Sequence, residues 1–577
     1  TYDMLTGLGL MALLLVLQEP ERLFDVSFLM SFGAVLGICI LTPVFSGGCW
    51  ERDADAESEV KGITTWLRTV ADILGDSAYE RNKYREGWRK VAYEGIRRMM
   101  SAVKGGFAAS VGVILFTLPV QLWFFYEIPV YSVLLNLLVL PFMSAVVAGG
   151  ILSLIPGLGI VGTVDCLILW WYEWICERFG ELPGAVWCVG QPEIWQIACY
   201  YAGIFLLVFG RRYVEAWKRR GTYGEENVPG VIIHSNRFQH QIATVMILGL
   251  LIGLLTGNFD RGSRVTFLDV GQGDGIVVET GQGAYLFDCG SISRKNIGEY
   301  VLKPYLKSRG ICSLRGVFVS HPDEDHMNGV LELLENGEEW GITAEQLFLP
   351  AIRESERRET FEQLLAAAED AGIPVSYIKC GDEIRDSQLR LLCLHPEENT
   401  TLADANAYSE CFYVEVFAKK MKQEAIDDRK ANDASGGSAI GKISILLTGD
   451  VEGEGERQLT QRLQALQESR SLQESQSLQT TRRLQEQRGQ REFRVDILKV
   501  AHHGSGYSTG TEFLATASPA IAIISCGRNN SYGHPHAETL QRLEDARVPW
   551  YGTMDYGALT VNVDSHGNRL HGYLSGK

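Results

Sequence analysis

The first 258 residues are dominated by long apolar runs without charge. Residues 26–45 and 105–126 contain no charged side chain, and residues 128–164 form one uncharged stretch that Pro156 and Gly157 can divide into two spans. A bilayer core about 30 Å thick is crossed by a helix of about 20 apolar residues. These runs therefore predict membrane-spanning helices.

Shorter or more polar runs extend the pattern. They cover residues 5–18, 157–175, 194–210 and 242–257. A run of about 14–17 residues is also compatible with a buried helix of a soluble protein. Counting both kinds, we expect six or seven spans in residues 1–258, which makes this part a polytopic α-helical membrane domain.

Basic residues between the apolar runs predict the orientation of the chain. They gather between Arg81 and Arg98 and again between Arg211 and Arg220. Such loops tend to stay in the cytoplasm. Four predicted spans lie between the two basic loops, so both assignments agree. The last span then places residues 259–577 outside the cytoplasm, in a multi-pass protein of the plasma membrane.

Residues 259–577 change to an alternation of short β-type runs and helical patterns, which is typical of an α/β domain. The predicted strands are residues 265–270, 276–279, 285–287, 317–320, 389–394, 412–417, 443–447, 497–500 and 521–525, and helical patterns cover 360–371 and 537–546. Residues 456–494 are rich in Gln, Leu, Arg and Ser and have no strong core period, which indicates a low-complexity insert, helical or disordered, without chemistry.

Charge narrows the function classes. The chain has 53 basic and 70 acidic residues, a formal net charge of −17. This balance argues against a protein that grips nucleic acid through a broadly basic surface. Any contact with nucleic acid would therefore depend on local basic patches or on bound metal ions.

The densest chemical signal follows the predicted strand at residues 317–320. His321, Asp323, Asp325 and His326 supply four nitrogen or oxygen ligands within six residues. Two metal ions about 3.5–4 Å apart can activate a water and stabilise both oxygens of a phosphodiester displacement. The alternative is an acidic solvated loop, but two His and two Asp at this spacing favour a metal site.

Further candidate ligands follow other predicted strands. Asp450 comes after Gly449 at the end of one strand, His502 and His503 end another, and His534 and His536 form a third group. Each is weak alone, since Gly-Asp is a common turn and a lone His is usually structural. Their gathering just beyond apolar strands predicts a shared metal centre.

These motifs resemble a known family. The pattern from His321 to His326 is similar to the metallo-β-lactamase HxHxDH motif, with Asp323 in place of the second His. Residues 268–274, 286–290, 448–450, 502–505 and 532–535 resemble the outer domain of ComEC-type competence channels, and residues 28–32, 117–119 and 136–141 resemble their membrane part. The early spans and the small soluble β-domain that usually begin that family have no counterpart in this sequence, and we expect that a natural N-terminus is missing before Thr1.

The resemblance implies a function. It implies an αββα sandwich, and a channel that passes single-stranded DNA across the membrane for natural transformation. The outer domain would meet duplex DNA and degrade the non-transported strand as a metal-dependent nuclease. DNA, the membrane and further competence proteins are the implied partners.

The resemblance also assigns residues. Asp288 matches a carboxylate behind the ligands, and the implied metal ligands are His321, Asp323, Asp325, His326, Asp450 and His502, with His503 as the alternative to His502. We expect the catalytic residues to be Asp325, Asp450, His503 and His534, with a histidine donating a proton or binding phosphate. Carboxylate and imidazole ligands without a nearby thiol favour two divalent ions, Mn or Zn.

One family ligand has no clear equivalent, because the isolated third His is missing between His326 and Asp450. His395 precedes a proline, and Ser409 stands in the region where the family often has Asn and Ser. Two rival functions therefore stay open. One is a membrane-anchored metallo-hydrolase of small phosphodiesters or envelope substrates, and the other is a transport protein with a degenerate metal domain.

Overall fold

The computed structural model describes residues 4–45, 82–155, 159–221, 237–257, 262–353, 357–398, 406–418, 441–478, 495–564 and 567–574. The chain divides into two compact units, Thr1–Asn258 and Phe259–Lys577.

The first unit is helical. Its α-helices are α1 (Met4–Gln18), α2 (Val26–Phe45), α4 (Asn82–Phe125), α5 (Ser132–Ser153), α6 (Gly159–Gly180), α7 (Ile194–Gly221) and α8 (Arg237–Thr256), with a short antiparallel pair of β1 (Glu127–Pro129) and β2 (Val186–Cys188). In the described residues, four helical segments are long and apolar enough to cross a membrane, in α2, α4, α5 and α6. Shorter apolar segments lie in α1, α7 and α8.

Small residues let two of these helices approach closely. A Cβ atom added to Gly37 of α2 would lie 2.5 Å from the backbone oxygen of Gly112 in α4, so both positions require glycine. The Tyr200 hydroxyl of α7 donates a hydrogen bond to the Leu115 carbonyl oxygen of α4, at 2.7 Å. Close packing and interhelical hydrogen bonds of this kind hold helices together where hydrophobicity alone cannot.

The basic segments predicted as loops are largely helical in backbone. Helix α4 begins at Asn82, so it includes most of the first basic segment, and α7 continues through residues 211–220 to Gly221. The prediction of loops is therefore wrong there, because Lys and Arg are good helix formers that can extend a helix beyond its apolar part. Arg81 lies outside the described residues. The orientation drawn from these segments stays a prediction.

The second unit contains two sheets. The first has the order β18 (Arg569–Gly572), β17 (Leu559–Val563), β3 (Ser263–Phe267), β4 (Gly275–Thr280), β5 (Gly283–Cys289), β6 (Ser313–Phe318), β8 (Leu347–Pro350), β9 (Val375–Ile378), with β7 (Thr343–Ala344) beside β6. The second has the order β10 (Glu383–Arg385), β11 (Leu389–His395), β12 (Cys411–Phe417), β13 (Lys442–Leu447), β14 (Ile497–Lys499), β15 (Ile521–Ile524), β16 (Trp550–Gly552).

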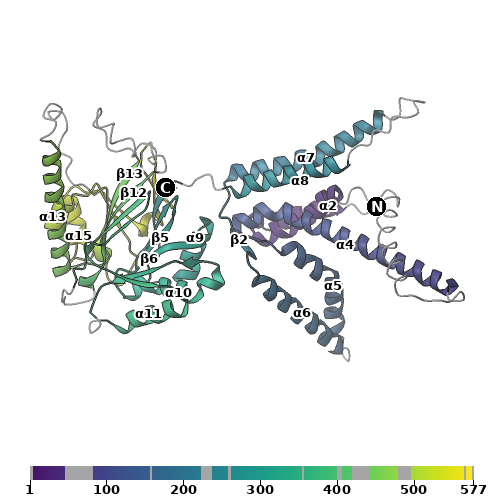
Figure 1. Cartoon of the computed structure of the whole chain (residues 1–577), viewed down its shortest axis with the longest axis horizontal. Helices are drawn as coiled ribbons and strands as arrows, with labels where there is room; N and C mark the ends of the chain where they lie inside the picture. Colours follow the sequence, from purple (N-terminus) through teal and green to yellow (C-terminus); the bar gives the residue numbers. More distant parts are fainter. Residues whose placement is uncertain are drawn as a thin grey trace. The chain divides into compact units, whose positions relative to one another are not determined.

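Helices cover the outer face of each sheet (Figure 1). Helices α9 (Lys303–Ser308), α10 (Glu324–Trp340) and α11 (Glu359–Asp370) pack on the first sheet, and α13 (Gly453–Leu478), α14 (Thr511–Ala517) and α15 (Ala537–Asp545) on the second. A third core between the sheets joins residues such as Phe267 and Val414. The unit is thus an αββα sandwich of the metallo-β-lactamase type, which confirms the predicted fold class.

The predicted strands all coincide with observed ones, although β7 to β10 and β16 to β18 were missed. The predicted insert at residues 456–494 needs a correction. Its first part is helix α13, in which Leu459 and Leu463 are fully buried in the core over the second sheet. The Gln-rich composition concealed these two core positions, which lie four residues apart on one helix face. Residues 479–494 lie outside the described part of the chain.

Candidate metal centre

The ends of four core strands position the site. The loop after β6 carries His321 and leads into α10, whose first turn holds Asp325 and His326. Asp288 lies at the end of β5, and Asp450 follows β13. The short helical turn η6 (Ala501–Gly504) follows β14 and carries the paired histidines. Residues far apart in the sequence therefore meet at one edge of the sandwich.

His326 is oriented by a carboxylate behind it. Its Nδ1 lies 2.9 Å from Asp288 Oδ2, and the Ser320 backbone N–H and hydroxyl both donate to Asp288 at 2.7 Å. The opposite ring nitrogen, Nε2, lies 3.1 Å from Asp450 Oδ1. A metal-binding His usually has its second nitrogen fixed by such a partner. Asp288 thus has the geometry that the family resemblance implies.

His503 is oriented in the same way. Its Nδ1 donates to the Ser525 carbonyl oxygen at 2.8 Å, and its Nε2 lies 3.4 Å from Asp325 Oδ2 and 3.3 Å from Asp450 Oδ2. The backbone of His502 and His503 has φ values of 47° and 53°, which non-glycine residues rarely adopt. Strained backbone of this kind gathers at functional sites. Here it turns the His503 ring into the cluster.

His321 completes the set from the other side. Its Nδ1 lies 3.2 Å from the Ser320 and Ser409 hydroxyls, and the Ser409 hydroxyl also accepts the Asp450 N–H at 3.2 Å. Its Nε2 lies 3.8 Å from Asp323 Oδ2. Ser409 therefore fixes both the His321 imidazole and the loop of Asp450.

These donors fit divalent metal ions. Two groups have ligand atoms within 4.8 Å of one another, namely Asp274, His326, Asp450 and His503, and His321, Asp325 and His326. Among the described residues, His326 Nε2, Asp450 Oδ1 and His503 Nε2 are buried without a well-aligned hydrogen bond. Buried polar atoms are normally satisfied, so atoms of this kind that converge call for a ligand. Imidazole and carboxylate donors suit Zn or Mn.

The electrostatics of the cluster also call for cations. Burial would lower the pKa of His503, but the carboxylates of Asp450 and Asp274 outweigh burial and raise the pKa to about 10. Burial would likewise raise the pKa of Asp450, but the cationic rings of His503 and His326 hold it well below the usual value. Protons on the imidazoles thus balance the carboxylates until other cations replace them.

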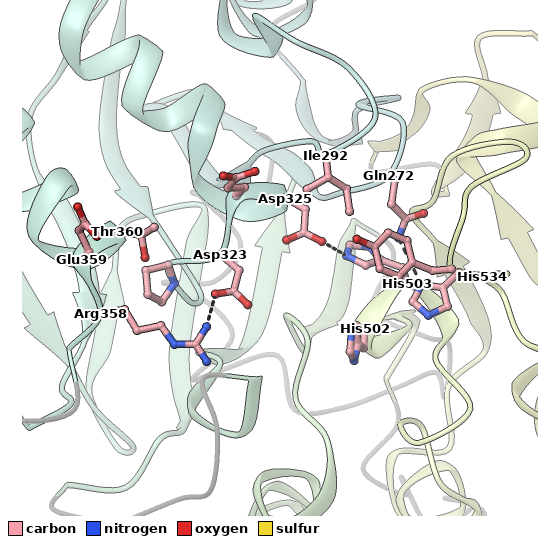
Figure 2. Close-up of a pocket in the computed structure, with 13 residues that line it drawn as sticks. Gln272, Ile292, Asp323, Asp325, Arg358, Glu359, Thr360, His502, His503 and His534 are labelled. Atoms are coloured by element: carbon pink, nitrogen blue, oxygen red, sulfur yellow. Dashed lines mark hydrogen bonds and ion pairs between the residues drawn. The ribbon is translucent and has the colours of Figure 1, made fainter.

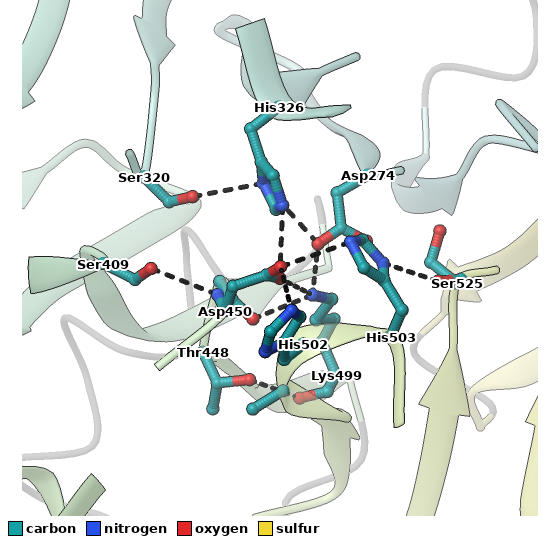
Figure 3. A network of polar contacts seen from close by, with 12 residues as sticks. Asp274, Ser320, His326, Ser409, Thr448, Asp450, Lys499, His502, His503 and Ser525 are labelled. Atoms are coloured by element: carbon teal, nitrogen blue, oxygen red, sulfur yellow. Dashed lines mark hydrogen bonds and ion pairs between the residues drawn. The ribbon is translucent and has the colours of Figure 1, made fainter. Parts of the chain in front are cut away.

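A buried ion pair underlies the ligands (Figure 3). Lys499 of β14 and Asp274, which precedes β4, are each 1% exposed in their side chains and form a short ion pair. The Lys499 ammonium also donates to the Gly449 carbonyl oxygen at 2.9 Å and lies 3.5 Å from Asp450 Oδ1. The sequence-based prediction missed both residues, although a single Lys in an apolar strand is a usable signal.

The glycine-rich loop that carries Asp274 packs against the segment that leads from His321 to Asp325. A Cβ atom on Gly273, whose φ is 151°, would lie 2.6 Å from the Asp325 carbonyl oxygen. The Asp274 N–H donates to the same oxygen at 3.0 Å. This close approach explains why the loop needs glycine, and it makes the segment part of the site as well as a turn.

Two predicted site residues, Asp323 and His502, lie at the edge of the cluster. Asp323 accepts a hydrogen bond from Arg358 at 2.9 Å and belongs to neither buried group. His502 Nδ1 lies 2.9 Å from Glu452, and its Nε2 is 3.7 Å from Asp450 Oδ2. The geometry therefore favours His503 over His502 as a metal ligand, which exchanges the roles expected for the two.

His534 and His395 have different surroundings. Gln272 Nε2 lies 3.3 Å from His534 Nδ1, and burial followed by the nearby His503 and His502 lowers the pKa of His534 to about 4. His395 Nε2 donates to the Ala407 carbonyl oxygen at 2.6 Å, away from the cluster. His395 is thus a structural histidine, whereas His534 faces the space above the site.

A cavity of about 440 Å³ opens over the cluster (Figure 2). It is lined by Gln272, Ile292, Pro322, Asp323, Glu324, Asp325, Arg358, Glu359, Thr360, His502, His503, Tyr532 and His534. In Figure 2, Arg358 and Asp323 lie on one side of the cavity and His534 on the other, with Asp325 and His503 between them. A molecule bound in the cavity would therefore contact the candidate metal ligands, the wall that carries Arg358 and the wall that carries His534.

Each of the two units is similar to a known protein family. Residues 1–213 match the competence protein family, and residues 268–364 match the metallo-β-lactamase superfamily. ComE operon protein 3 of Bacillus subtilis is 26% identical over 463 residues, which cover 76% of this chain and 50% of that protein. Recombination protein 2 of Haemophilus influenzae is 24% identical over 481 residues, covering 79% and 50%. The chain thus spans about half the length of these relatives.

Among solved structures, the metallo-β-lactamase fold protein YhfI of Bacillus subtilis is similar to 50% of this chain over 95% of its own length. The two are 10% identical, with a TM-score of 0.27.

The ion pair beneath the ligands generates a first prediction. Lys499→Met leaves buried carboxylates without a cation and should reduce the free energy of unfolding by about 3–5 kcal/mol, and Asp274→Asn should have a similar effect. The double variant should cost less than the sum. The measurement is pulse proteolysis of the full chain in detergent across a urea series. Lys379→Met, which removes an exposed ion pair with Glu398, is the control. Additive losses would contradict the coupling.

The protonated imidazoles generate a second prediction. His503 has a pKa of about 10, so at pH 8 it holds a proton that a metal ion must displace. Binding of Mn²⁺ should release protons, and the apparent affinity should rise as the pH rises towards about 10. Calorimetry in buffers of different ionisation enthalpy measures the release. His503→Gln should reduce it, whereas the exposed His571→Gln should not. Binding without proton release would show that the imidazoles are neutral.

Proposed function

Because this chain is a ComEC-type protein, in which a competence-protein part precedes a metallo-β-lactamase part, we propose that it acts in DNA uptake during competence. Residues 1–258 would pass a single strand across the membrane, and residues 259–577 would form a metal-dependent nuclease that degrades the other strand. The observation that carries the enzymatic part is the set of buried, unpartnered ligand atoms beneath a cavity.

Each group in the site has a role in this proposal. His326, Asp450 and His503 would hold one divalent ion beside Asp274, and His321 with Asp325 would contribute to a second, close to His326. When bound, the ions supply Lewis acidity and an activated water for attack on phosphorus. His502 and His534 face the cavity and would contact the phosphate oxygens. Asp323 would bind at the second ion only if its contact with Arg358 were released.

Orientation of the hydrogen bonds supports the role of His534. The Gly527 N–H donates to Gln272 Oε1 at 3.3 Å, so the amide nitrogen of Gln272 faces His534 Nδ1 and donates to it. Because the low pKa of His534 makes the ring neutral, its proton lies on Nε2. The ring would therefore donate a hydrogen bond to a phosphate oxygen.

The geometry of the buried cluster also bears on the two rival functions, a hydrolase of small phosphodiesters and a transport protein with a degenerate metal domain. In a domain that has lost its metal site, nothing would require buried donors such as His326 and His503 to be held in orientation by hydrogen bonds. The geometry therefore supports an enzyme. A hydrolase of small phosphodiesters remains the second candidate, since the cavity of about 440 Å³ has the size of a small-ligand site.

The nuclease proposal predicts a loss of cleavage in ligand variants. Asp450→Asn removes a carboxylate that faces both His326 and His503, and it should lower cleavage of labelled DNA by more than about 100-fold together with the metal content. The measurement uses the full chain in detergent with Mn²⁺ or Zn²⁺, and circular dichroism checks the fold. Glu345→Gln, an exposed carboxylate outside the cavity, is the control. Unchanged cleavage in Asp450→Asn would contradict the proposed site.

The proposed location has its own test. The positive-inside pattern predicts that the nuclease domain is extracytoplasmic. A single cysteine introduced at the exposed Tyr300, in a variant without the native cysteines, should react with a membrane-impermeant maleimide in intact cells. A cysteine at residue 218 should react only after the cells are lysed. The reverse pattern would place the domain in the cytoplasm.

A further inference from the structure

The position of the ligands limits what can reach them. The side chains of His321, His326, Asp450 and His503 are at most 2% exposed. They lie beneath a cavity of about 440 Å³, whose walls come from separate elements. A phosphodiester must therefore enter the cavity to reach them, and a space of about 440 Å³ does not hold a segment of duplex.

One wall of the cavity offers an aromatic surface. The Tyr532 side chain is 55% exposed, and its ring is stacked on His534 with 5.8 Å between ring centroids and 29° between the planes. The His534 ring is in turn stacked near His503, at 6.2 Å and 30°. Tyr532 thus forms the solvent end of a series of rings that leads down to a metal ligand.

The loop that carries Tyr532 is held in place. The Asn530 side chain accepts hydrogen bonds from the Tyr532 and His534 N–H groups, at 3.1 and 3.0 Å, and donates to the His534 carbonyl oxygen at 2.6 Å. His536 joins this loop to Gly506, whose N–H donates to Nδ1 at 2.8 Å, while Nε2 donates to the Tyr532 carbonyl oxygen. A fixed aromatic ring loses little entropy when a planar ligand stacks on it.

The opposite wall offers a cation. Among the described residues that line the cavity, Arg358 is the one Lys or Arg, and its side chain is 52% exposed. One guanidinium nitrogen contacts Asp323, and the group has further N–H donors that can contact a phosphate. Figure 2 shows Arg358 and His534 on opposite sides of Asp325 and His503.

From this arrangement we propose that the cavity is a subsite for an unpaired nucleotide strand. One base stacks on the exposed face of Tyr532. The phosphodiester next to that base lies over the metal ligands, and the following phosphate of the strand contacts Arg358. The inference rests on the proposed nuclease function and adds the substrate class. Base stacking on an aromatic ring tolerates any sequence, as a degradative site requires.

The main test compares Tyr532→Ala with Tyr532→Phe in the full chain in detergent. Stacking on an aromatic side chain contributes about 1–3 kcal/mol per base, so Tyr532→Ala should raise the KM for a labelled single-stranded 12-mer by roughly tenfold. Tyr532→Phe keeps the ring and should retain the parent KM. Hydrolysis of a single-stranded 12-mer of abasic residues, which keeps the phosphodiesters and has no aromatic ring, should be the same in both variants. Tyr300→Ala, an exposed tyrosine outside the cavity, is the matched control.

A second measurement separates this inference from the nuclease function. Binding of labelled trithymidylate, followed by fluorescence anisotropy, requires no cleavage. Tyr532→Ala should weaken it about tenfold relative to Tyr300→Ala, and Arg358→Gln should reduce the salt slope by about 0.7. Such binding without hydrolysis of any substrate would support the subsite and reject the nuclease.

Three results would overturn the subsite. The first is equal trithymidylate binding by Tyr532→Ala and Tyr300→Ala. The second is cleavage of a duplex with covalently closed ends as efficiently as of the single strand. The third is an equal effect of Tyr532→Ala on the 12-mer and on the abasic 12-mer, which would indicate that Tyr532 only supports the fold.

Discussion

The ion pair between Asp274 and Lys499 is the interaction on which the rest of the centre depends. Asp274 precedes a strand of the first sheet and Lys499 lies in the second, so the pair joins the two sheets beneath the ligands. The same ammonium holds the Gly449 carbonyl oxygen, and the Asp274 N–H holds the carbonyl oxygen of Asp325. Burial of two charges costs free energy that their attraction only partly returns. The pair is therefore better explained by the positions it fixes than by added stability.

Charge balance connects this pair to the metal ions. Asp274, Asp288, Asp325 and Asp450 bring four carboxylates into a small volume, with Lys499 as a permanent cation. Protons on the imidazoles supply further positive charge, since the pKa values of His326 and His503 are raised. Those protons occupy the nitrogens that a metal ion would bind. Binding of metal ions would therefore displace protons from the cluster. Without the ions, the protons and Lys499 still balance the carboxylates, so the domain can fold before it binds metal.

The strand and helix patterns predicted an α/β domain, and the family resemblance added the αββα sandwich. Most residues of the buried cluster could be predicted because strand ends bring His and Asp residues together. The sequence-based prediction missed Asp274, because an Asp in a glycine-rich segment is typical of a simple turn, and it missed Lys499, because a lone charge in a strand has no partner in the pattern. The choice between His502 and His503 depends on a left-handed backbone that no spacing reveals. Arg358, which withdraws Asp323, lies 35 residues further along the chain.

Under the proposed function, a recessed centre has a consequence for the order of events in DNA uptake. If phosphodiesters must enter a narrow cavity one strand at a time, an intact duplex outside the membrane is protected until its strands separate. Passage of one strand through the membrane would itself release the other, which would then become the substrate. Cleavage would follow transport without any signal between the two units, because the shape of the cavity selects for the unpaired product. The acidic domain would need no broad DNA-binding surface, since stacking and a single guanidinium can hold one strand where a duplex cannot fit.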